Sequence, residues 1–315
     1  MRATTSERMD AMPVQEPANP AGPAQSRARF FNSGNAFNVK LPPVPAAVFP
    51  AAAVPVLGAA TGFVLCDQSE SLALPYPATT PLMLARYAAI APNADLTARF
   101  KATGAIWYVI AGAGTSTIEN ESFDWSSGDV FLSPGGVELN LRADREGAVL
   151  WVVTNEPQLA FDYLQPAHGE ECGVDVVHYP ALEIRHQLER VVNASRDEDT
   201  AGLALIFSSE RNAAGRNILP SLTLSLNTLP SGERQRKHRH NSAAVTLILS
   251  GRRCYSIVGA ERCDWSQYAT LVTPPAEPHS HHNDGDERAL FLIVQDGGLH
   301  YHARTMGFAF LEPEA

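Results

Sequence analysis

Histidine is absent from the first 167 residues of this 315-residue sequence, although the chain contains 10 histidines in all. Seven of them fall between His238 and His302. Imidazole is the commonest metal ligand of proteins and titrates near neutral pH. We therefore expect a metal-binding or catalytic site in the last quarter of the chain.

Basic residues are in the minority, with 24 Lys and Arg against 34 Asp and Glu and a formal charge of −10. A protein built mainly to hold nucleic acid needs a basic field, so we expect no nucleic-acid partner. A small acidic substrate is compatible with the charge, because one local arginine can bind it. No helix-turn-helix pattern of a DNA-binding regulator is present.

No apolar stretch predicts a membrane helix. The longest, residues 41–64, contains prolines at 42, 43, 45, 50 and 55, which exclude a spanning helix. Arg2 is followed by no uninterrupted apolar core, so a secretory signal is not expected. Four cysteines form no C-x-x-C pair, and we interpret them as reduced thiols of a cytoplasmic protein, with a pairing of Cys254 and Cys263 across a hairpin as the alternative.

From about residue 80 the chain consists of short apolar runs separated by turn residues, which predicts a β-barrel or sandwich. In the first half these runs are 82–89, 106–110, 116–118, 129–132 and 148–153; in the second they are 221–226, 244–249, 253–258, 269–272, 289–294 and 300–302. Between them, Leu182, Ile184, Leu188 and Val191 follow helical spacing and predict a helix over 180–193.

The two halves repeat each other. Thr246–Gly251 resembles Trp107–Gly112, and Asp264-Trp265-Ser266 repeats Asp124-Trp125-Ser126, with an offset of 139 or 140 residues each time. We predict a tail over 1–40 that is disordered or extended, a first domain over 41–165, a linker with a helix over 166–215 and a second domain over 216–315.

The second domain carries two histidine clusters. His238 and His240 are two residues apart, so in a strand both point to one face. His279 and His281 follow about forty residues later. Three neutral imidazoles with open positions suit a catalytic zinc or iron. A solvated polar run over 234–240 is the alternative.

These residues resemble the two signatures of the cupin superfamily, Gly232-(x5)-His238-x-His240-(x10)-Gly251 and Pro274-(x4)-His279-(x3)-Asn283. The resemblance implies an all-β fold of two cupin barrels (double-stranded β-helix, or jelly roll) joined by a short helical connection. Ala244 stands where the usual cupin has a glutamate ligand. A three-histidine site in a two-cupin chain is similar to gentisate 1,2-dioxygenase and its relatives, and residues 227–296 carry that likeness.

The first half lacks the ligands, since Arg99 and Lys101 stand where His238 and His240 stand, and both are protonated at pH 7. We therefore expect a metal-free first cupin. The family usually has its metal in that cupin, so this chain departs from the commoner arrangement.

The resemblance implies an Fe(II)-dependent ring-cleavage dioxygenase of aromatic catabolism, with small aromatic diols and O2 as substrates. His238, His240 and His279 match the metal ligands, and His281 matches a catalytic histidine that hydrogen-bonds the substrate. Asn227, Thr246 and Asp296 are candidate substrate contacts. The family has a carboxylate-binding arginine where this chain has Thr246. That loss favours hydroquinone or aminohydroquinone over gentisate or a substituted salicylate, unless Arg234, Arg236 or Arg288 supplies the charge.

Two other classes stay open at this point. One is a metal cupin that acts as a lyase or isomerase without oxygen chemistry, and the other is a non-enzymatic, ligand-binding bicupin. Barrel edges and the proline-rich segment 41–60, which we expect to be an extended arm lying on the body, also suggest a homodimer or homotetramer.

Overall fold

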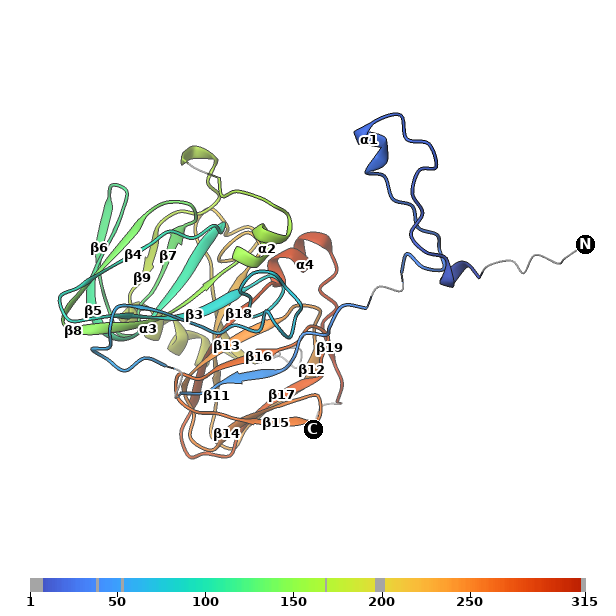
Figure 1. The fold of residues 1–315 in the computed structure, drawn as a ribbon. Helices are drawn as coiled ribbons and strands as arrows, with labels where there is room; N and C mark the ends of the chain where they lie inside the picture. Colours follow the sequence, from blue (N-terminus) through green and yellow to red (C-terminus); the bar gives the residue numbers. More distant parts are fainter. Residues whose placement is uncertain (1–7, 38–39, 52–53, 168, 196–201, 313–315) are drawn as a thin grey trace, which may run out of the picture. The chain divides into compact units, whose positions relative to one another are not determined.

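The structure is a computed structural model that describes residues 8–37, 40–51, 54–167, 169–195 and 202–312 (Figure 1). The chain divides into two compact units, Met1–Pro42 and Pro43–Ala315. The described part of the first unit contains a 3-10 helix η1 (Met9–Ala11), a short helix α1 (Pro23–Ser26) and a bridge between Gln15 and Phe30.

Within the second unit, a first barrel is built from one continuous sheet in the order β2-β3-β8-β5-β7-β9, with β4 on β8 and β6 on β5. Two long strands of this barrel, β5 and β8, pair with each other along most of their length, with two register shifts in the pairing. The strands are β2 (Gly62–Leu65), β3 (Leu84–Ile90), β4 (Asp95–Ala98), β5 (Gly104–Ile118), β6 (Glu121–Ser126), β7 (Val130–Pro134), β8 (Leu139–Thr154) and β9 (Val177–Tyr179).

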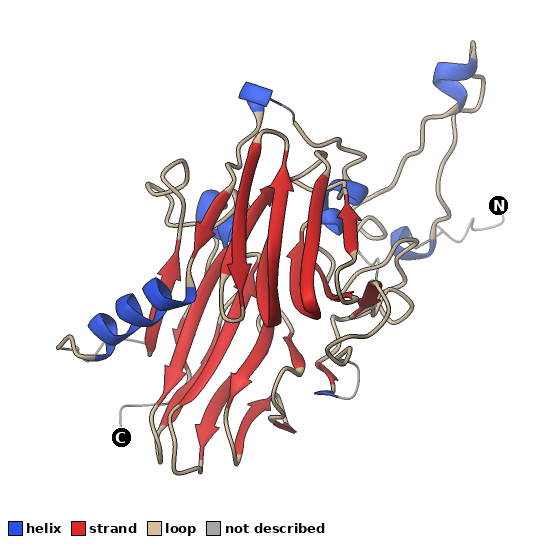
Figure 2. Ribbon diagram, turned by 90° about the vertical axis from the view of Figure 1, so that its left-hand side faces the viewer, coloured by secondary structure: helices blue, strands red, loops and turns tan. Residues whose placement is uncertain are grey.

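The second barrel consists of two facing sheets, in the orders β1-β16-β13-β18-β11-β10 and β15-β14-β17-β12-β19. Figure 2 shows that strands make up most of the fold and that the helices lie around them. The strands are β1 (Ala47–Phe49), β10 (Leu203–Phe207), β11 (Thr223–Leu229), β12 (Arg234–Arg239), β13 (Ala244–Ser250), β14 (Cys254–Val258), β15 (Glu261–Asp264), β16 (Thr270–Thr273), β17 (His279–Asn283), β18 (Ala289–Gln295) and β19 (Ala309–Phe310).

The predicted repeat is present in the strands themselves. Strand β3 begins at residue 84 and β11 at residue 223, which is 139 further on; β8 and β17 begin at 139 and 279, which is 140 further on. The prediction of an all-β fold with two barrels is confirmed. The predicted first domain, residues 41–165, includes the segment 41–60. In the structure, strand β1 of that segment pairs with β16 of the second barrel.

Within the described residues, the helices that accompany the sheets include α2 (Glu156–Phe161), the 3-10 helix η3 (Gly169–Glu171), α3 (Ala181–Val192) and α4 (Gly297–Ala303). The predicted helix over 180–193 is confirmed by α3. The predicted strand over 300–302 is wrong, because these residues lie in α4. Gly298 lets the start of this helix pack closely on the backbone before β11, since a Cβ there would meet the Pro220 carbonyl oxygen at 2.6 Å.

Alternation along the strands produces three cores. One fills the first barrel, one fills the second, and the third lies between them and includes Ile184 and Leu188 of α3. In the core between the barrels, the Tyr87 hydroxyl lies 2.7 Å from Thr270 Oγ1, and Trp151 Nε1 donates to the same oxygen at 3.0 Å. Buried hydrogen bonds thus join the two barrels.

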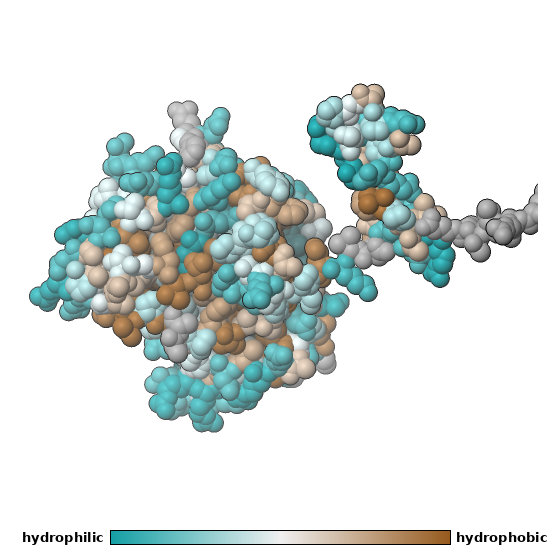
Figure 3. Space-filling view, in the orientation of Figure 1, coloured by the Kyte–Doolittle hydropathy of each residue, from teal (hydrophilic) through white to brown (hydrophobic). Residues whose placement is uncertain are grey.

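All four cysteines are free thiols, and Cys263 pairs in register with Ser256 rather than with Cys254. Among the described residues, no helix is long and apolar enough to cross a membrane. The surface in Figure 3 mixes polar and apolar groups, and its lower end, over the β14–β15 hairpin, is hydrophilic.

Candidate metal centre and substrate pocket

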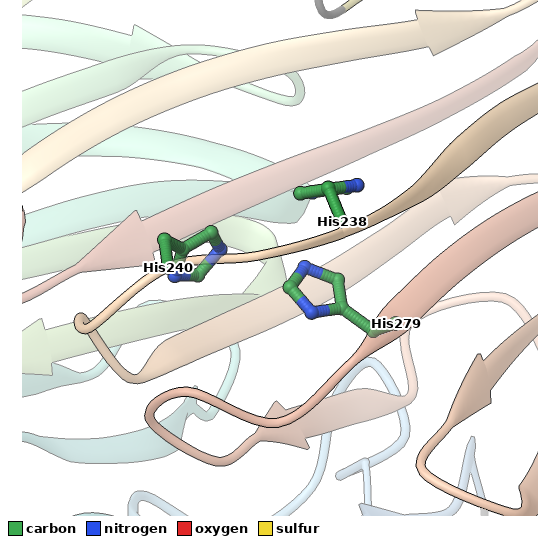
Figure 4. Close-up of side chains that lie close together, drawn as sticks. All are labelled: His238, His240 and His279. Carbon is green, nitrogen blue, oxygen red and sulfur yellow. The ribbon is translucent and has the colours of Figure 1, made fainter. Parts of the chain in front are cut away.

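Three predicted histidines meet inside the second barrel (Figure 4). His238 lies near the end of β12, His240 follows that strand, and His279 opens β17 directly opposite His238. The pairing of β12 with β17 contains a register shift between Gln235 and His238. This shift sets His238 opposite His279, so that both histidines lie on the inner face. All three histidines are buried, with exposed fractions of 4%, 6% and 3%.

Each of the three rings is held through its Nδ1 atom by a backbone carbonyl. The carbonyl partners are Arg236 at 2.8 Å for His238, Ser242 at 2.9 Å for His240 and Glu277 at 2.8 Å for His279. A carbonyl only accepts, so Nδ1 carries the hydrogen and Nε2 keeps its lone pair. This anchoring is typical of histidines that bind a metal.

Burial keeps these rings neutral. It lowers the pKa of His279 to about 3, with the neighbouring His238 and His240 as further causes, and it lowers the pKa of His240 to about 4. Burial also lowers the pKa of His238. Neutral imidazoles keep the lone pair that a metal requires.

The donor set fits a divalent transition metal. One candidate ligand atom from each histidine lies within 4.8 Å of the others. Two nitrogens bound to one ion at about 2.1 Å lie at most about 4.2 Å apart, so a small rotation of the rings closes them on an ion. Three imidazoles without a carboxylate leave room for substrate in the coordination sphere.

His281 lies two residues beyond His279 on β17 and is buried on the same inner face. Its Nδ1 lies 2.8 Å from Ser256 Oγ, and the Trp265 indole donates to that same oxygen at 2.9 Å. Burial lowers the pKa of His281 well below its usual value, with His279 as the next cause. The structure therefore brings the predicted catalytic histidine to the triad as a neutral ring.

The facing sheet presents neutral polar groups to this cluster. On β11, Leu229 belongs to the core of the second barrel, and Asn227 shares its inner face. On β13, Thr246 lies between the inward-facing Ala244 and Ile248 and is 3% exposed. The predicted contacts Asn227 and Thr246 thus lie on the inner face, and Asn227 Nδ2 donates to Ser225 Oγ at 2.8 Å.

Asp296 has a different contact. Its Oδ1 accepts the Ala243 backbone N–H at 2.9 Å, which ties the start of α4 to the sheet. The residue before it, Gln295, is the one that approaches the triad, with Nε2 3.3 Å from His240 Nε2. Sequence reasoning missed Gln295, although the alternation of Phe291, Ile293 and Gln295 on β18 places it inside.

Gln295 also lines a pocket of about 460 Å³, together with Ser225, Arg216 and Tyr301 among others. Ligand pockets of enzymes commonly span about 300–1,000 Å³. Of the three arginines considered from the sequence, Arg234 pairs with Glu312, Arg288 pairs with Glu189, and Arg236 lies over the ring of Phe310. Arg234 and Arg236 also line a small pocket of about 110 Å³ together with Asn227.

The C-terminal strand β19 adds an aromatic wall that the sequence did not indicate. It pairs with β12, and Phe310 lies opposite His238 in register. The ring of Phe308 lies 5.4 Å from that of His238. Neither phenylalanine belongs to a sequence motif. Their position beside the histidines follows only from the pairing of β19 with β12.

The first barrel is filled instead of hollow. Arg99 and Lys101 are exposed, while Phe100 between them is 8% exposed and points inward. Phe100 lies 5.8 Å from Trp107, which stacks 5.6 Å from Phe131. Leu139, at the position of His279, is buried in the same core. Aromatic rings therefore occupy the space that histidines line in the second barrel.

Comparison with known proteins agrees with this division. Residues 225–295 match the cupin domain family, and residues 81–209 match the AraC-like ligand binding domain family. The chain is 34% identical over 82 residues to gentisate 1,2-dioxygenase of Ralstonia sp, covering 26% of this chain and 23% of that protein. It is 26% identical over 132 residues to 1-hydroxy-2-naphthoate 1,2-dioxygenase of Nocardioides sp. (strain KP7), covering 39% and 33%. The matches thus span a third or less of these curated relatives.

A solved structure resembles the chain over most of its length. Salicylate 1,2-dioxygenase from Pseudoaminobacter salicylatoxidans, with gentisate, superposes with a TM-score of 0.71 at 13% identity over 88% of each chain. At that identity the likeness concerns the fold.

Proposed function

On the premise that this chain is a bicupin protein of the cupin superfamily, we propose that it is an Fe(II)-dependent dioxygenase that cleaves the ring of a para-diol aromatic. The observation that carries the proposal is the buried triad of His238, His240 and His279, with its ligand atoms within 4.8 Å of one another. The partial sequence likeness to gentisate and hydroxynaphthoate dioxygenases supports the reaction class.

We assign the metal to the second cupin and none to the first. His238, His240 and His279 would hold Fe(II) through Nε2. When bound, Fe(II) would supply a redox-active centre at which the aromatic diol and O2 react. The chain's own groups bind and orient the substrate, and the Phe308 ring beside His238 limits the access of water.

His281 is the proposed catalytic histidine. Because its ring is neutral and buried beside the triad, it can hydrogen-bond an oxygen of the substrate. Asn227 is the proposed amide contact from the facing sheet. Asp296 stays a prediction as a substrate contact, since its Oδ1 accepts the Ala243 N–H.

Hydroquinone or aminohydroquinone is the favoured substrate. The inner-face residues Asn227, Thr246 and Gln295 are all neutral, so none of them offers a charge for a ring carboxylate. The relatives are named for gentisate, hydroxynaphthoate and salicylate, all of which carry one. Arg216, at the pocket that Gln295 also lines, is the group that would admit such substrates.

The test is oxygen uptake by protein purified without oxygen and loaded with Fe(II), Zn(II) or Mn(II). Iron-dependent uptake with hydroquinone or aminohydroquinone is expected, with no turnover by His238→Ala. Uptake with gentisate alone would overturn the substrate preference. Turnover with zinc or manganese in the absence of O2 would establish a lyase or isomerase, and binding without turnover a ligand-binding bicupin. Full metal content in His238→Ala would overturn the site assignment.

We also propose a homodimer or homotetramer. The edge strands β2 and β10 carry exposed apolar side chains, with Val64, Leu65 and Ile206 exposed at 41%, 40% and 53%. Association that covers such edges protects them from aggregation. Light scattering coupled to size exclusion measures the state, and a monomer at micromolar concentration would refute the proposal.

A further inference from the structure

The four histidines inside the second barrel differ in the partner of their Nδ1 atoms. For His238, His240 and His279, that partner is a backbone carbonyl at 2.8–2.9 Å. His240 Nδ1 also lies 2.9 Å from Ser242 Oγ, and its N–H can be shared between that oxygen and the carbonyl. For His281 the partner is the hydroxyl oxygen of Ser256 at 2.8 Å. A carbonyl can only accept a hydrogen bond, whereas a hydroxyl can donate or accept. The direction of this one bond therefore decides the tautomer of His281.

Trp265 settles that direction. Its indole N–H can only donate, and it donates to Ser256 Oγ at 2.9 Å. Ser256 is 1% exposed, and the ring of His281 supplies the other contact of its oxygen. If His281 also donated, the buried serine hydrogen would lack an acceptor, at a cost of about 1–3 kcal/mol. The hydroxyl hydrogen therefore points to Nδ1, and the neutral ring carries its own hydrogen on Nε2.

We propose that Trp265 and Ser256 are positioning residues that hold His281 in the Nε2–H tautomer, opposite to the tautomer of the three ligands. In that tautomer His281 presents a hydrogen to a substrate oxygen instead of a lone pair to the metal. Its consequence for catalysis rests on the proposed function; the tautomer itself does not.

The packing around His281 supports a fixed orientation. Its ring centroid lies 5.2 Å from that of Phe291, 5.9 Å from that of Trp265 and 5.9 Å from that of His279. His281 thus lies beside the triad without belonging to the group of three whose ligand atoms converge. Its Nε2 hydrogen would be available to a bound substrate.

The chain contains a matched control on the opposite face of β17. Ser280 Oγ lies 2.9 Å from His282 Nε2, and His282 stacks on Tyr255 with ring centroids 4.6 Å apart. This pair has the same two residue types but turns away from the triad. Ser280→Ala therefore removes a serine–histidine contact next to the site without touching Ser256.

The experiment reads the tautomers by long-range ¹H–¹⁵N correlation on protein labelled in histidine, both metal-free and loaded with zinc. The signal of His281 is identified by its loss in His281→Gln. We expect Nε2–H for His281 and Nδ1–H for the three ligands. Ser256→Ala and Trp265→Phe should shift His281 towards Nδ1–H, Ser256→Thr should restore Nε2–H, and Ser280→Ala should change nothing. An Nδ1–H tautomer in the unsubstituted protein, or no change in both Ser256→Ala and Trp265→Phe, overturns the proposal.

A kinetic arm separates this inference from the proposed function. In iron-loaded protein, Ser256→Ala should lower kcat about 10- to 100-fold while iron content and KM stay close to those of the unsubstituted protein. Unchanged kcat would overturn the catalytic consequence. Absence of ring cleavage in every variant, with the tautomers as expected, would overturn the proposed function and leave the assignment of the tautomer standing.

Discussion

Asp296 provides a test of how burial acts on this fold. Its carboxyl group is 5% exposed, and burial raises its pKa from 3.8 to about 7, against the opposing effect of the Ala243 N–H that it accepts. In the unfolded chain this group ionises near 4. Between these two values the folded state holds a proton that the unfolded state has released.

The sign follows from this difference. Where the folded state binds more protons than the unfolded state, stability falls as pH rises. The penalty is absent below about pH 4, grows between about pH 4 and 7, and is complete above the folded pKa. Three pH units correspond to at most about 4 kcal/mol, because one unit is worth 1.36 kcal/mol. Rearrangement around the charge reduces the expected effect to about 1–3 kcal/mol.

Asp296→Asn removes the titration and keeps an oxygen that can accept the Ala243 N–H. The quantity to compare is the free energy of unfolding of the variant minus that of the unsubstituted protein. This difference should be about 1–3 kcal/mol larger at pH 8 than at pH 4.5. Urea denaturation of metal-free protein at several pH values measures the difference, in which the titrations common to both proteins cancel. Asp162→Asn, at an exposed position after α2, is the control. A difference that does not vary with pH would refute the reasoning.

Three further outcomes are expected. His279→Ala removes one of the three proposed ligands, so metal content measured by plasma emission should fall to near the background of the metal-free protein, and a fully loaded variant would contradict the assignment. Arg216→Ala should raise the KM for gentisate about tenfold or more and leave that for hydroquinone unchanged, and equal effects on both would remove Arg216 from carboxylate recognition. Thr270→Val leaves the Trp151 N–H without its acceptor between the barrels, so thermal and urea denaturation should show a loss of about 1–3 kcal/mol, whereas Asp162→Asn at its exposed position should be neutral within about 0.5 kcal/mol.

Much of the architecture could be predicted because it repeats in the sequence. The 139- to 140-residue offset and the alternation of apolar residues are local patterns, and both recur in the strands. The convergence of His238 and His240 on one face also follows from strand geometry. Helix α4 was missed because three residues of alternation do not distinguish a strand from a turn of helix.

The supporting groups of the site could not be predicted in the same way. Gln295 and Ser256 reach the histidines from other strands, and Phe308 does so from the segment before β19, through pairings that no local pattern encodes. Asp296 was selected over Gln295 by motif likeness, although alternation on β18 favours Gln295 for the inner face. The tautomers were also inaccessible, since they depend on whether a carbonyl or a hydroxyl stands beside each Nδ1.

Strand β1 has a consequence for how the molecule is made. Ala47 pairs with Val272, which is 225 residues later in the chain. The ribosome therefore produces this edge strand before the first barrel, and its partner strand only after the first barrel. Until β16 emerges, residues 47–49 lack their pairing partner, while the first barrel has all the strands of its sheet. The second barrel consequently closes after the strands of the first barrel have been made, around a strand that was synthesised before them.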